Sequence, residues 1–143
     1  VTDANGNTLS RSSYSVSYDR DSKSAGRHTV KITLKGNYSG TMKRSYTINP
    51  RATSVSKLSK KSKGFTVKVK KLSAATATGY QVQYSLNSNF KGAKTKTISG
   101  TSLTVKRLKG NKKYYVRVRT YKKSGSKKYY SSWSGAKTVK TRR

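Results

Sequence analysis

Short runs in which apolar and polar residues alternate constrain the fold of this chain most strongly. Tyr114, Val116 and Val118 alternate with polar or charged neighbours, and residues 30–34 and 80–84 repeat the pattern. A period of two places successive side chains on opposite faces of a strand, so each run indicates a half-buried β-strand. No apolar run has the 3.6-residue period of an amphipathic helix. We therefore expect an all-β chain.

Composition alone favours a different conclusion. With 31% hydrophobic residues and a formal net charge of +31, the chain has the composition of a disordered polycation. Eleven tyrosines, together with frequent Val and Thr, are nevertheless strand-forming residues, and they follow the alternating pattern. We conclude that the chain folds and that repulsion between its cations lowers the stability of the fold.

The distribution of charge divides the sequence in two. Residues 1–50 contain eight of the 34 lysines and arginines and all three aspartates. The other 26 basic residues lie in residues 51–143, which contain no Asp or Glu, and the only proline, Pro50, stands at the change. We predict two small β-sandwich modules in tandem, residues 1–49 and 51–143. The first is short for an independent core, so we expect it to be truncated.

The sequence offers few groups for chemistry. It contains no Cys and no Glu, and His28 is its only histidine, which excludes disulfides and thiolate metal sites. His28 could join a serine and Asp19 or Asp21 in a triad, but no Gly-x-Ser-x-Gly elbow is present. The segments around Asp3 and Asp19 lack the ligand series of a calcium loop. We predict no catalysis, no metal and no cofactor.

Residues 51–141 resemble a fibronectin type III domain. The segment LKGNKKYYVRVRT, from Leu108 to Thr120, is similar to the stretch from the end of strand E through strand F of that family. The resemblance implies a seven-stranded β-sandwich in which Tyr114 is the tyrosine-corner residue, its hydroxyl bonded to the backbone a few residues upstream. It also implies that Leu108 is a buried leucine. Val69 stands where the family usually has a core tryptophan, which implies a smaller core.

Residues 1–49 resemble a bacterial immunoglobulin-like surface repeat, most clearly in residues 1–7 and 35–41. The pairing of such a repeat with a lysine-rich type III domain is similar to the C-terminal ends of secreted proteins from clostridia-like gut bacteria. This resemblance implies a secreted or bacterial cell-surface protein with a role in binding or adhesion. It does not identify a ligand, because modules of these folds carry many functions.

The segment YSSWS, Tyr130–Ser134, resembles the Trp-Ser-x-Trp-Ser motif of cytokine receptors, in which aromatic rings interleave with strand F arginines. The matching residues here are Tyr130, Trp133, Arg117 and Arg119. In one interpretation this aromatic–cation ladder stiffens the domain. In the other it is a platform on which sugars or bases stack. We favour the structural interpretation.

Basic clusters add little beyond the total charge. Residues 59–64 and 105–110 fit the pattern x-basic-basic-x-basic-x of heparin-binding segments, but a chain this basic produces such matches by chance. Residues 122–130 place four lysines around a Ser-Gly-Ser tip, and we expect a flexible loop there. Such a loop is either simply solvated or grips phosphate or sulfate groups.

We predict a non-catalytic, supercharged cationic module, most simply a monomer, that binds polyanions through many weak contacts. The expected partners are cell-wall teichoic acid, host glycosaminoglycan or mucin, and DNA or RNA. The candidate binding residues are Lys60, Lys61, Lys63, Lys68, Lys70, Lys106, Arg107, Arg117, Arg119, Lys122, Lys123, Lys127, Lys128, Lys137 and Lys140. Two alternatives stay open: a passive spacer or wall-anchoring domain of a larger surface protein, and a cationic cell-penetrating effector acting on an anionic membrane.

Overall fold

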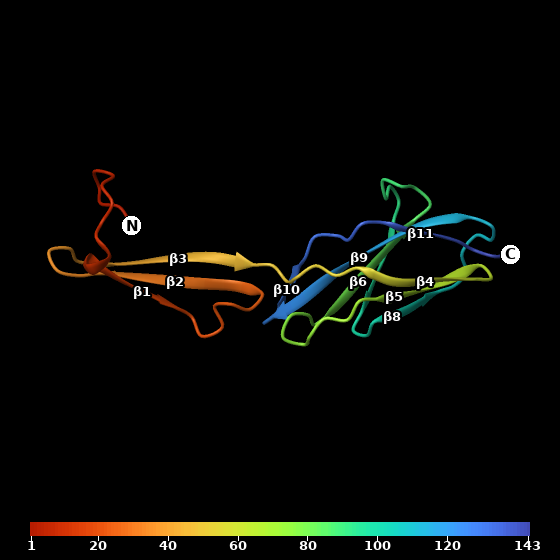
Figure 1. Ribbon diagram of the computed structural model, residues 1–143, viewed down its shortest axis with the longest axis horizontal. Coiled ribbons are helices and arrows are strands. Elements are labelled where there is room, and N and C mark those ends of the chain that lie inside the picture. The colour runs from red at the N-terminus through yellow and green to blue at the C-terminus, as the bar shows by residue number, and fades with distance from the viewer. The chain divides into compact units, whose positions relative to one another are not determined.

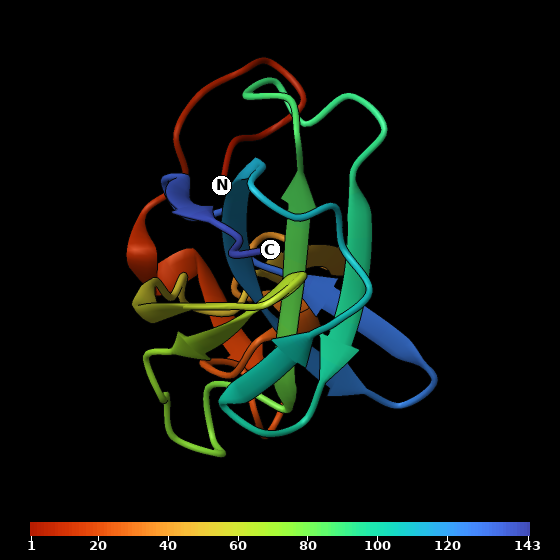
Figure 2. The same ribbon diagram turned by 90° about the vertical axis from the view of Figure 1, so that its right-hand side faces the viewer.

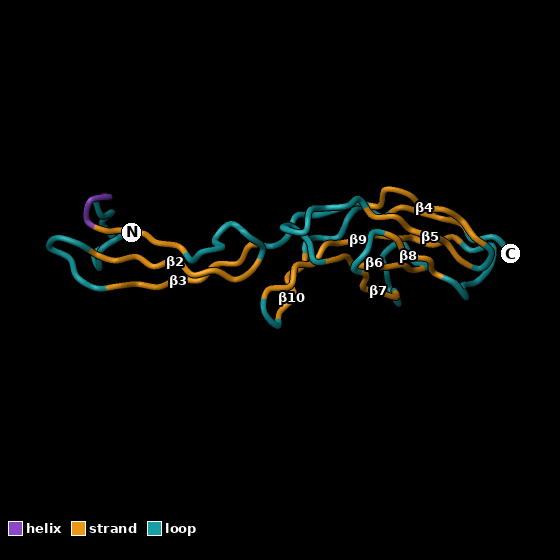
Figure 3. Tube along the Cα trace, turned by 90° about the horizontal axis from the view of Figure 1, so that it is seen from below, coloured by secondary structure: helices purple, strands orange, loops and turns teal.

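The computed structural model describes residues 1–143, and its regular secondary structure is almost entirely β-strand (Figure 1). Its contacts group the chain into two compact units, Val1–Ile48 and Asn49–Arg143. The one helical piece is a 3₁₀ turn, η1 (Arg11–Ser13), drawn in purple in Figure 3. None of the structure's helical segments has the length and apolar character needed to cross a membrane. The prediction of an all-β chain is confirmed.

The first unit contains one antiparallel sheet. Its strands β1 (Tyr14–Tyr18), β2 (Gly26–Leu34) and β3 (Thr41–Ile48) lie in the order β1-β2-β3. Val16 lies opposite Ile32, which lies opposite Met42, so the apolar side chains of the three strands share one face. These three strands make no second sheet, and the relation of this unit to an immunoglobulin-like repeat stays a prediction.

The second unit contains two sheets that enclose a common core. Their strands are β4 (Val55–Lys61), β5 (Gly64–Val69), β6 (Gly79–Ser85), β7 (Lys94–Ile98), β8 (Ser102–Val105), β9 (Lys113–Ser124), β10 (Lys127–Tyr130) and β11 (Lys137–Lys140). One sheet has the order β4-β5-β8 and the other β10-β9-β6-β7, with β11 also paired to β9. Figure 2 shows β6 and β7 as two green strands running side by side.

The core of this second unit consists of the inward positions of the alternating runs. Phe65, Val67, Val82, Val116 and Val118 are completely buried. The Phe65 ring packs edge-on against Tyr84, with 5.7 Å between ring centroids, and also contacts Tyr114 at 6.1 Å. These are the positions that the alternation assigns to the inner face, so the pattern and the packing agree. Leu108 departs from the prediction because it is only partly buried at the edge of this core.

Two features of the second unit differ from the sequence-based expectation. The unit has eight strands where seven were expected, because β10 forms in addition to the final strand β11, and the two pair with opposite halves of β9. The expected flexible loop at residues 122–130 is instead a tight hairpin, because β9 continues to Ser124 and β10 begins at Lys127. Gly125 supplies the positive φ, 57°, that this two-residue turn requires.

Candidate functional site

The two heparin-like clusters, far apart in sequence, meet at one end of the second unit. The Leu108 amide donates to the Lys63 carbonyl at 2.8 Å, which joins the β8–β9 connection to the β4–β5 turn. The C-terminal segment joins the same end, since Lys63 N–H donates to the Arg142 carbonyl at 3.1 Å and Arg142 N–H to the Lys61 carbonyl at 2.9 Å. Backbone hydrogen bonds therefore gather three basic segments.

We call this end the cationic pole. It comprises Lys61, Lys63, Arg107, Lys109, Lys112, Arg142 and Arg143, all of them exposed. The sequence predicted the first three as site residues, and Lys60 and Lys106 stand beside them in the chain. Lys109 belongs to the heparin-like cluster at residues 105–110 but was not counted as a site residue, and no local pattern distinguishes the other three from the general excess of basic residues. The backbone contacts of Lys63 and Arg142 alone reveal that they are neighbours.

Two basic residues of the cationic pole have unusual backbone conformations. Lys63 has a φ of 44° and Arg107 a φ of 58°, in the left-handed region that side chains other than glycine and asparagine seldom adopt. Each such residue costs about 1 kcal/mol relative to an ordinary conformation. Lys63 lies in the turn between β4 and β5 and Arg107 in a bend of the β8–β9 connection, and a glycine would be the less strained choice at either position.

The two arginines of β9 do not project freely, which corrects the expectation that they are available to a ligand. The Arg117 guanidinium lies between the rings of Phe90, 4.0 Å away, and Trp133, 4.9 Å away. The Arg119 guanidinium lies between Trp133 at 4.4 Å and Tyr130 at 4.1 Å. The five side chains form one alternating stack of rings and cations, in which Phe90 is the member that the sequence did not indicate.

Hydrogen bonds to β6 fix the same two arginines. Arg117 Nε donates to the Gln83 side-chain oxygen at 2.7 Å, and Arg119 Nε donates to that of Gln81 at 2.9 Å. Burial lowers the pKa of Arg119; the neighbouring Tyr130 opposes this effect and Arg117 adds to it. Both guanidinium groups are thus half-buried parts of the fold, and this arrangement supports the structural interpretation of the ladder.

In the segment between β10 and β11, two serines provide the hydrogen bonds to β9 that a regular strand would make. The Ser131 amide donates to the Thr120 carbonyl and the Ser131 hydroxyl accepts from the Thr120 amide, both at 3.0 Å. Ser134 does the same with Val118, at 2.8 Å and 3.0 Å. Each hydroxyl takes the place of a ladder carbonyl, so β9 keeps its hydrogen bonds where its partner strand is interrupted. Ser131 and Ser134 of the YSSWS segment are therefore as structural as its tryptophan.

The lysines of the β9–β10 hairpin divide into bound and free groups. Lys122 Nζ donates to the Ala74 carbonyl at 2.8 Å, and Lys128 Nζ lies 5.0 Å from the Tyr121 ring centroid. Lys123 and Lys127 are exposed and have no side-chain contact of this kind. The hairpin thus offers two unconstrained cations, not the four expected of a flexible loop.

The remaining candidate lysines are exposed but lie on different strands. Lys68 lies on β5 of the three-stranded sheet, and Lys70 directly follows the end of that strand. Lys137 and Lys140 lie on β11, which belongs to the other sheet. The structure thus spreads the candidate residues over the unit, with one group at the cationic pole and another on the β9–β10 hairpin.

Tyr114 makes the contact that the resemblance implies. Its hydroxyl accepts a hydrogen bond from the Lys109 amide, five residues upstream, at 3.2 Å, while its ring is buried at 6% exposure. A family model for the fibronectin type III domain matches residues 49–135, more than half of the chain. The chain belongs to the fibronectin type III family.

Solved structures are similar to this fibronectin type III chain in fold. The crystal structure of domains FN1–FN3 of chicken CNTN1 superposes with a TM-score of 0.58 and 19% identity, covering 87% of this chain and 45% of that one. A titin segment matches with a TM-score of 0.49 and 18% identity, covering 87% and 43% of the two chains. This chain therefore spans less than half the length of either. A comparison with curated proteins gave no match.

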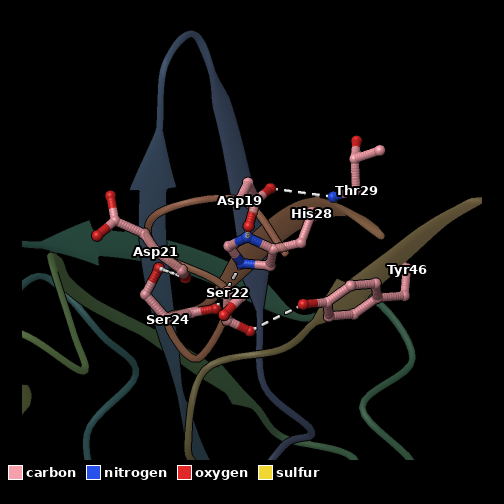
Figure 4. A network of polar contacts seen from close by, with 7 residues as sticks. All are labelled: Asp19, Asp21, Ser22, Ser24, His28, Thr29 and Tyr46. Carbon is pink, nitrogen blue, oxygen red and sulfur yellow. Dashed lines mark hydrogen bonds and ion pairs between the residues drawn. The ribbon is translucent and has the colours of Figure 1, made fainter. Parts of the chain in front are cut away.

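Domains of the fibronectin type III family are typically non-catalytic modules of surface or secreted proteins. The first unit lies wholly outside the matched residues and holds the one His–Asp pair (Figure 4). His28 Nδ1 lies 3.0 Å from Asp19 Oδ1, but its Nε2 faces the Ser24 carbonyl at 2.8 Å instead of a serine hydroxyl. Asp19 also accepts from the Thr29 amide at 3.0 Å, so this cluster closes the β1–β2 connection.

Asp3 is likewise occupied within the first unit. Its carboxylate accepts hydrogen bonds from the amides of Asn5, at 2.9 Å, and Asn7, at 2.8 Å. These bonds, with that from Asn7 the largest contributor, lower the pKa of Asp3. N–H donors thus take the oxygens that a calcium loop would direct at a cation.

Proposed function

We propose that the fibronectin type III unit is a non-catalytic, polyanion-binding module of a secreted or surface-attached bacterial protein. One observation carries the proposal: none of the 34 lysines and arginines lies within ion-pair distance of a carboxylate, since the one contact between an acidic and a basic side chain joins Asp19 to His28. In the second unit, 26 cations share the surface with no acidic side chain. A surface of this kind attracts anionic polymers over long range and binds them by releasing condensed counterions.

The candidate interface is narrower than the sequence suggests. We exclude Arg117, Arg119 and Lys122 as primary contacts, because rings or protein oxygens already engage their charged groups. The cationic pole takes their place, because backbone hydrogen bonds bring seven exposed basic residues from three segments together there. The exposed lysines of β5 and β11 extend the interface along the sheets. Teichoic acid, sulfated or sialylated glycans and nucleic acid all offer the required charge.

Salt dependence of binding tests the proposal directly. Binding of fluorescein-labelled oligothymidylate and of labelled heparin should be measured by anisotropy at several sodium chloride concentrations. For the oligonucleotide, a footprint of about 5–8 phosphates gives a slope of log K against log salt of roughly −4 to −6. A matched pair of variants locates the contacts: Lys61→Gln/Lys63→Gln/Arg142→Gln should weaken binding far more than Arg20→Gln/Lys23→Gln/Arg44→Gln in the first unit.

The two alternatives predict other outcomes. A passive spacer binds neither polymer near physiological salt, and a slope near zero would remove the electrostatic account. A membrane-active effector releases dye from anionic vesicles, which a polyanion-binding module at the same concentration does not do. No specific observation favours membrane activity, since the single helical segment is the three-residue η1.

A further inference from the structure

An open cleft of about 380 Å³ borders the cationic pole. It lies between the β6–β7 connection and the β8–β9 connection, and its lining includes the buried rings of Tyr84 and Tyr114. Four cations line it as well: Lys91 and Lys94 from one side, and Arg107 and Lys109 from the other. With no acidic residue in this unit, nothing offsets their charge.

Both walls of the cleft are fixed by hydrogen bonds within the protein. In the β6–β7 connection the buried Ser85 hydroxyl donates to the Lys91 carbonyl at 3.0 Å and accepts from the Asn87 amide at 3.1 Å. In the β8–β9 connection the Lys109 amide donates to the Tyr114 hydroxyl. A cleft held in this way loses little conformational entropy when a ligand enters, which favours binding.

The Tyr84 hydroxyl is free to meet such a ligand. Tyr84 is 5% exposed, and its hydroxyl makes no hydrogen bond within the protein. Thr120 Oγ1 is the only side-chain polar atom that is both fully enclosed and without a hydrogen-bond partner. Because the Tyr84 hydroxyl also has no partner, it is not fully enclosed and must reach solvent. Tyr84 lines the cleft, so the hydroxyl reaches solvent there. Burial, with a contribution from Tyr114, raises the pKa of Tyr84 and keeps the hydroxyl a neutral donor.

We propose that this cleft binds one acidic sugar unit, sulfated or carboxylated, of an anionic polysaccharide. The proposal rests on the proposed function and assigns it a specific site. The four cations complement sulfate or carboxylate groups, and Tyr84 and Asn87 can hydrogen-bond sugar hydroxyls. The side chains of Leu86, 44% exposed, and Leu108 offer apolar surface to ring C–H groups. Such a mixture of apolar surface and few polar groups is typical of small-ligand sites.

Size and shape favour a sugar over duplex nucleic acid. The cleft lies near the lower end of the usual volume range for ligand pockets, so it accommodates a small unit and not a length of polymer. Duplex nucleic acid carries its phosphates on a convex surface and has no projecting unit to insert. The rest of a polysaccharide chain would leave the cleft across the cationic pole, which shares Arg107 and Lys109 with it.

A heparin disaccharide carrying sulfate and uronate groups is the probe, titrated into the full chain by NMR or calorimetry. Its desulfated, N-acetylated counterpart, inorganic sulfate and a thymidine tetranucleotide are the comparison ligands. Lys94→Gln/Arg107→Gln removes two cations of the cleft, whereas Arg51→Gln/Lys57→Gln removes one Lys and one Arg that are exposed elsewhere. Tyr84→Phe removes only a hydroxyl, and thermal melting verifies that each variant is folded.

We expect Lys94→Gln/Arg107→Gln to weaken disaccharide binding by about tenfold or more, since each lost charge-assisted hydrogen bond is on the order of tenfold. The control variant Arg51→Gln/Lys57→Gln should change disaccharide binding less than about twofold. Tyr84→Phe should weaken disaccharide binding severalfold and leave binding of long heparin intact. Equal effects of the two double variants, or tighter binding of the tetranucleotide, would overturn the assignment of the cleft but not polyanion binding. If the unmodified protein does not bind heparin, both the cleft assignment and polyanion binding are overturned.

Discussion

Thr120 is the residue at which the core of the type III unit is least satisfied. Its side chain is completely buried on the inner face of β9, and its hydroxyl oxygen has no hydrogen-bond partner. A buried polar group without a partner costs about 1–3 kcal/mol. Thr120→Val keeps the shape and the backbone amide that binds Ser131, so it should raise the free energy of unfolding by about 1 kcal/mol. Urea denaturation measures this, and a less stable variant would mean that the hydroxyl has an unrecognised partner.

The tyrosine corner gives a prediction of opposite sign. Tyr114→Phe removes the acceptor of the Lys109 amide and should lower the free energy of unfolding by about 1 kcal/mol. Leu108→Ala should cost less than the roughly 2–5 kcal/mol of a fully buried leucine, because Leu108 is only partly buried. Both are measured by urea denaturation. Unchanged midpoints for both variants would mean that this corner does not contribute to stability.

At this scale the sequence predicted side-chain orientation well and side-chain partners poorly. Alternation identifies Val116 and Val118 as inward residues and Arg117 and Arg119 as outward ones, because it depends only on the strand's period. It does not identify Phe90, which reaches Arg117 from a connection outside the strand and adopts a φ of 61° there. Contacts of this kind depend on tertiary structure, which local patterns do not encode.

Among the elements, the segment between β10 and β11 depends on two hydroxyl groups. Ser131→Ala leaves the buried Thr120 amide without an acceptor, and Ser134→Ala does the same to Val118. Each should lower the free energy of unfolding by about 1–3 kcal/mol. Ser132→Ala is the matched control, because Ser132 is exposed and its hydroxyl makes no hydrogen bond. Trp133, the only tryptophan, reports the unfolding by fluorescence, and equal midpoints for the three variants would contradict the structural role of Ser131 and Ser134.

Elements were missed where regular patterns break. β4 contains a register shift between Val55 and Lys57, which disrupts the period of two, so its residues look like part of a charged run. The hairpin at residues 122–130 was expected to be a loop because lysine and serine dominate it. The two strands of this hairpin extend beyond the core, so their side chains need not be apolar. Pairs such as Lys128 opposite Lys123 therefore stand in regular strands.

On the scale of the whole molecule, the balance of charge determines the response to salt. With no lysine or arginine paired to a carboxylate and a net charge of +31, nearly every pair of neighbouring charges in the protein repels. The screening length falls from about 10 Å at 0.1 M salt to about 3 Å at 1 M, which is less than the separation of neighbouring side chains on a sheet. Added salt should therefore stabilise the folded chain, in contrast to a protein held together by surface ion pairs.

Melting temperatures measure this effect. Between about 0.05 M and 1 M sodium chloride we expect a rise of about 5 °C or more, since 1 kcal/mol corresponds to about 4–8 °C for a domain of this size. Sucrose at equal osmolality separates screening from exclusion of cosolute, and it should raise the melting temperature less. Heparin should give a similar rise at far lower concentration, because it binds the folded array of cations more strongly than the unfolded chain. A melting temperature that is flat in salt would mean that the charges are too widely spaced to act together, and the same dispersion would leave the cationic pole too weak to concentrate an anionic polymer.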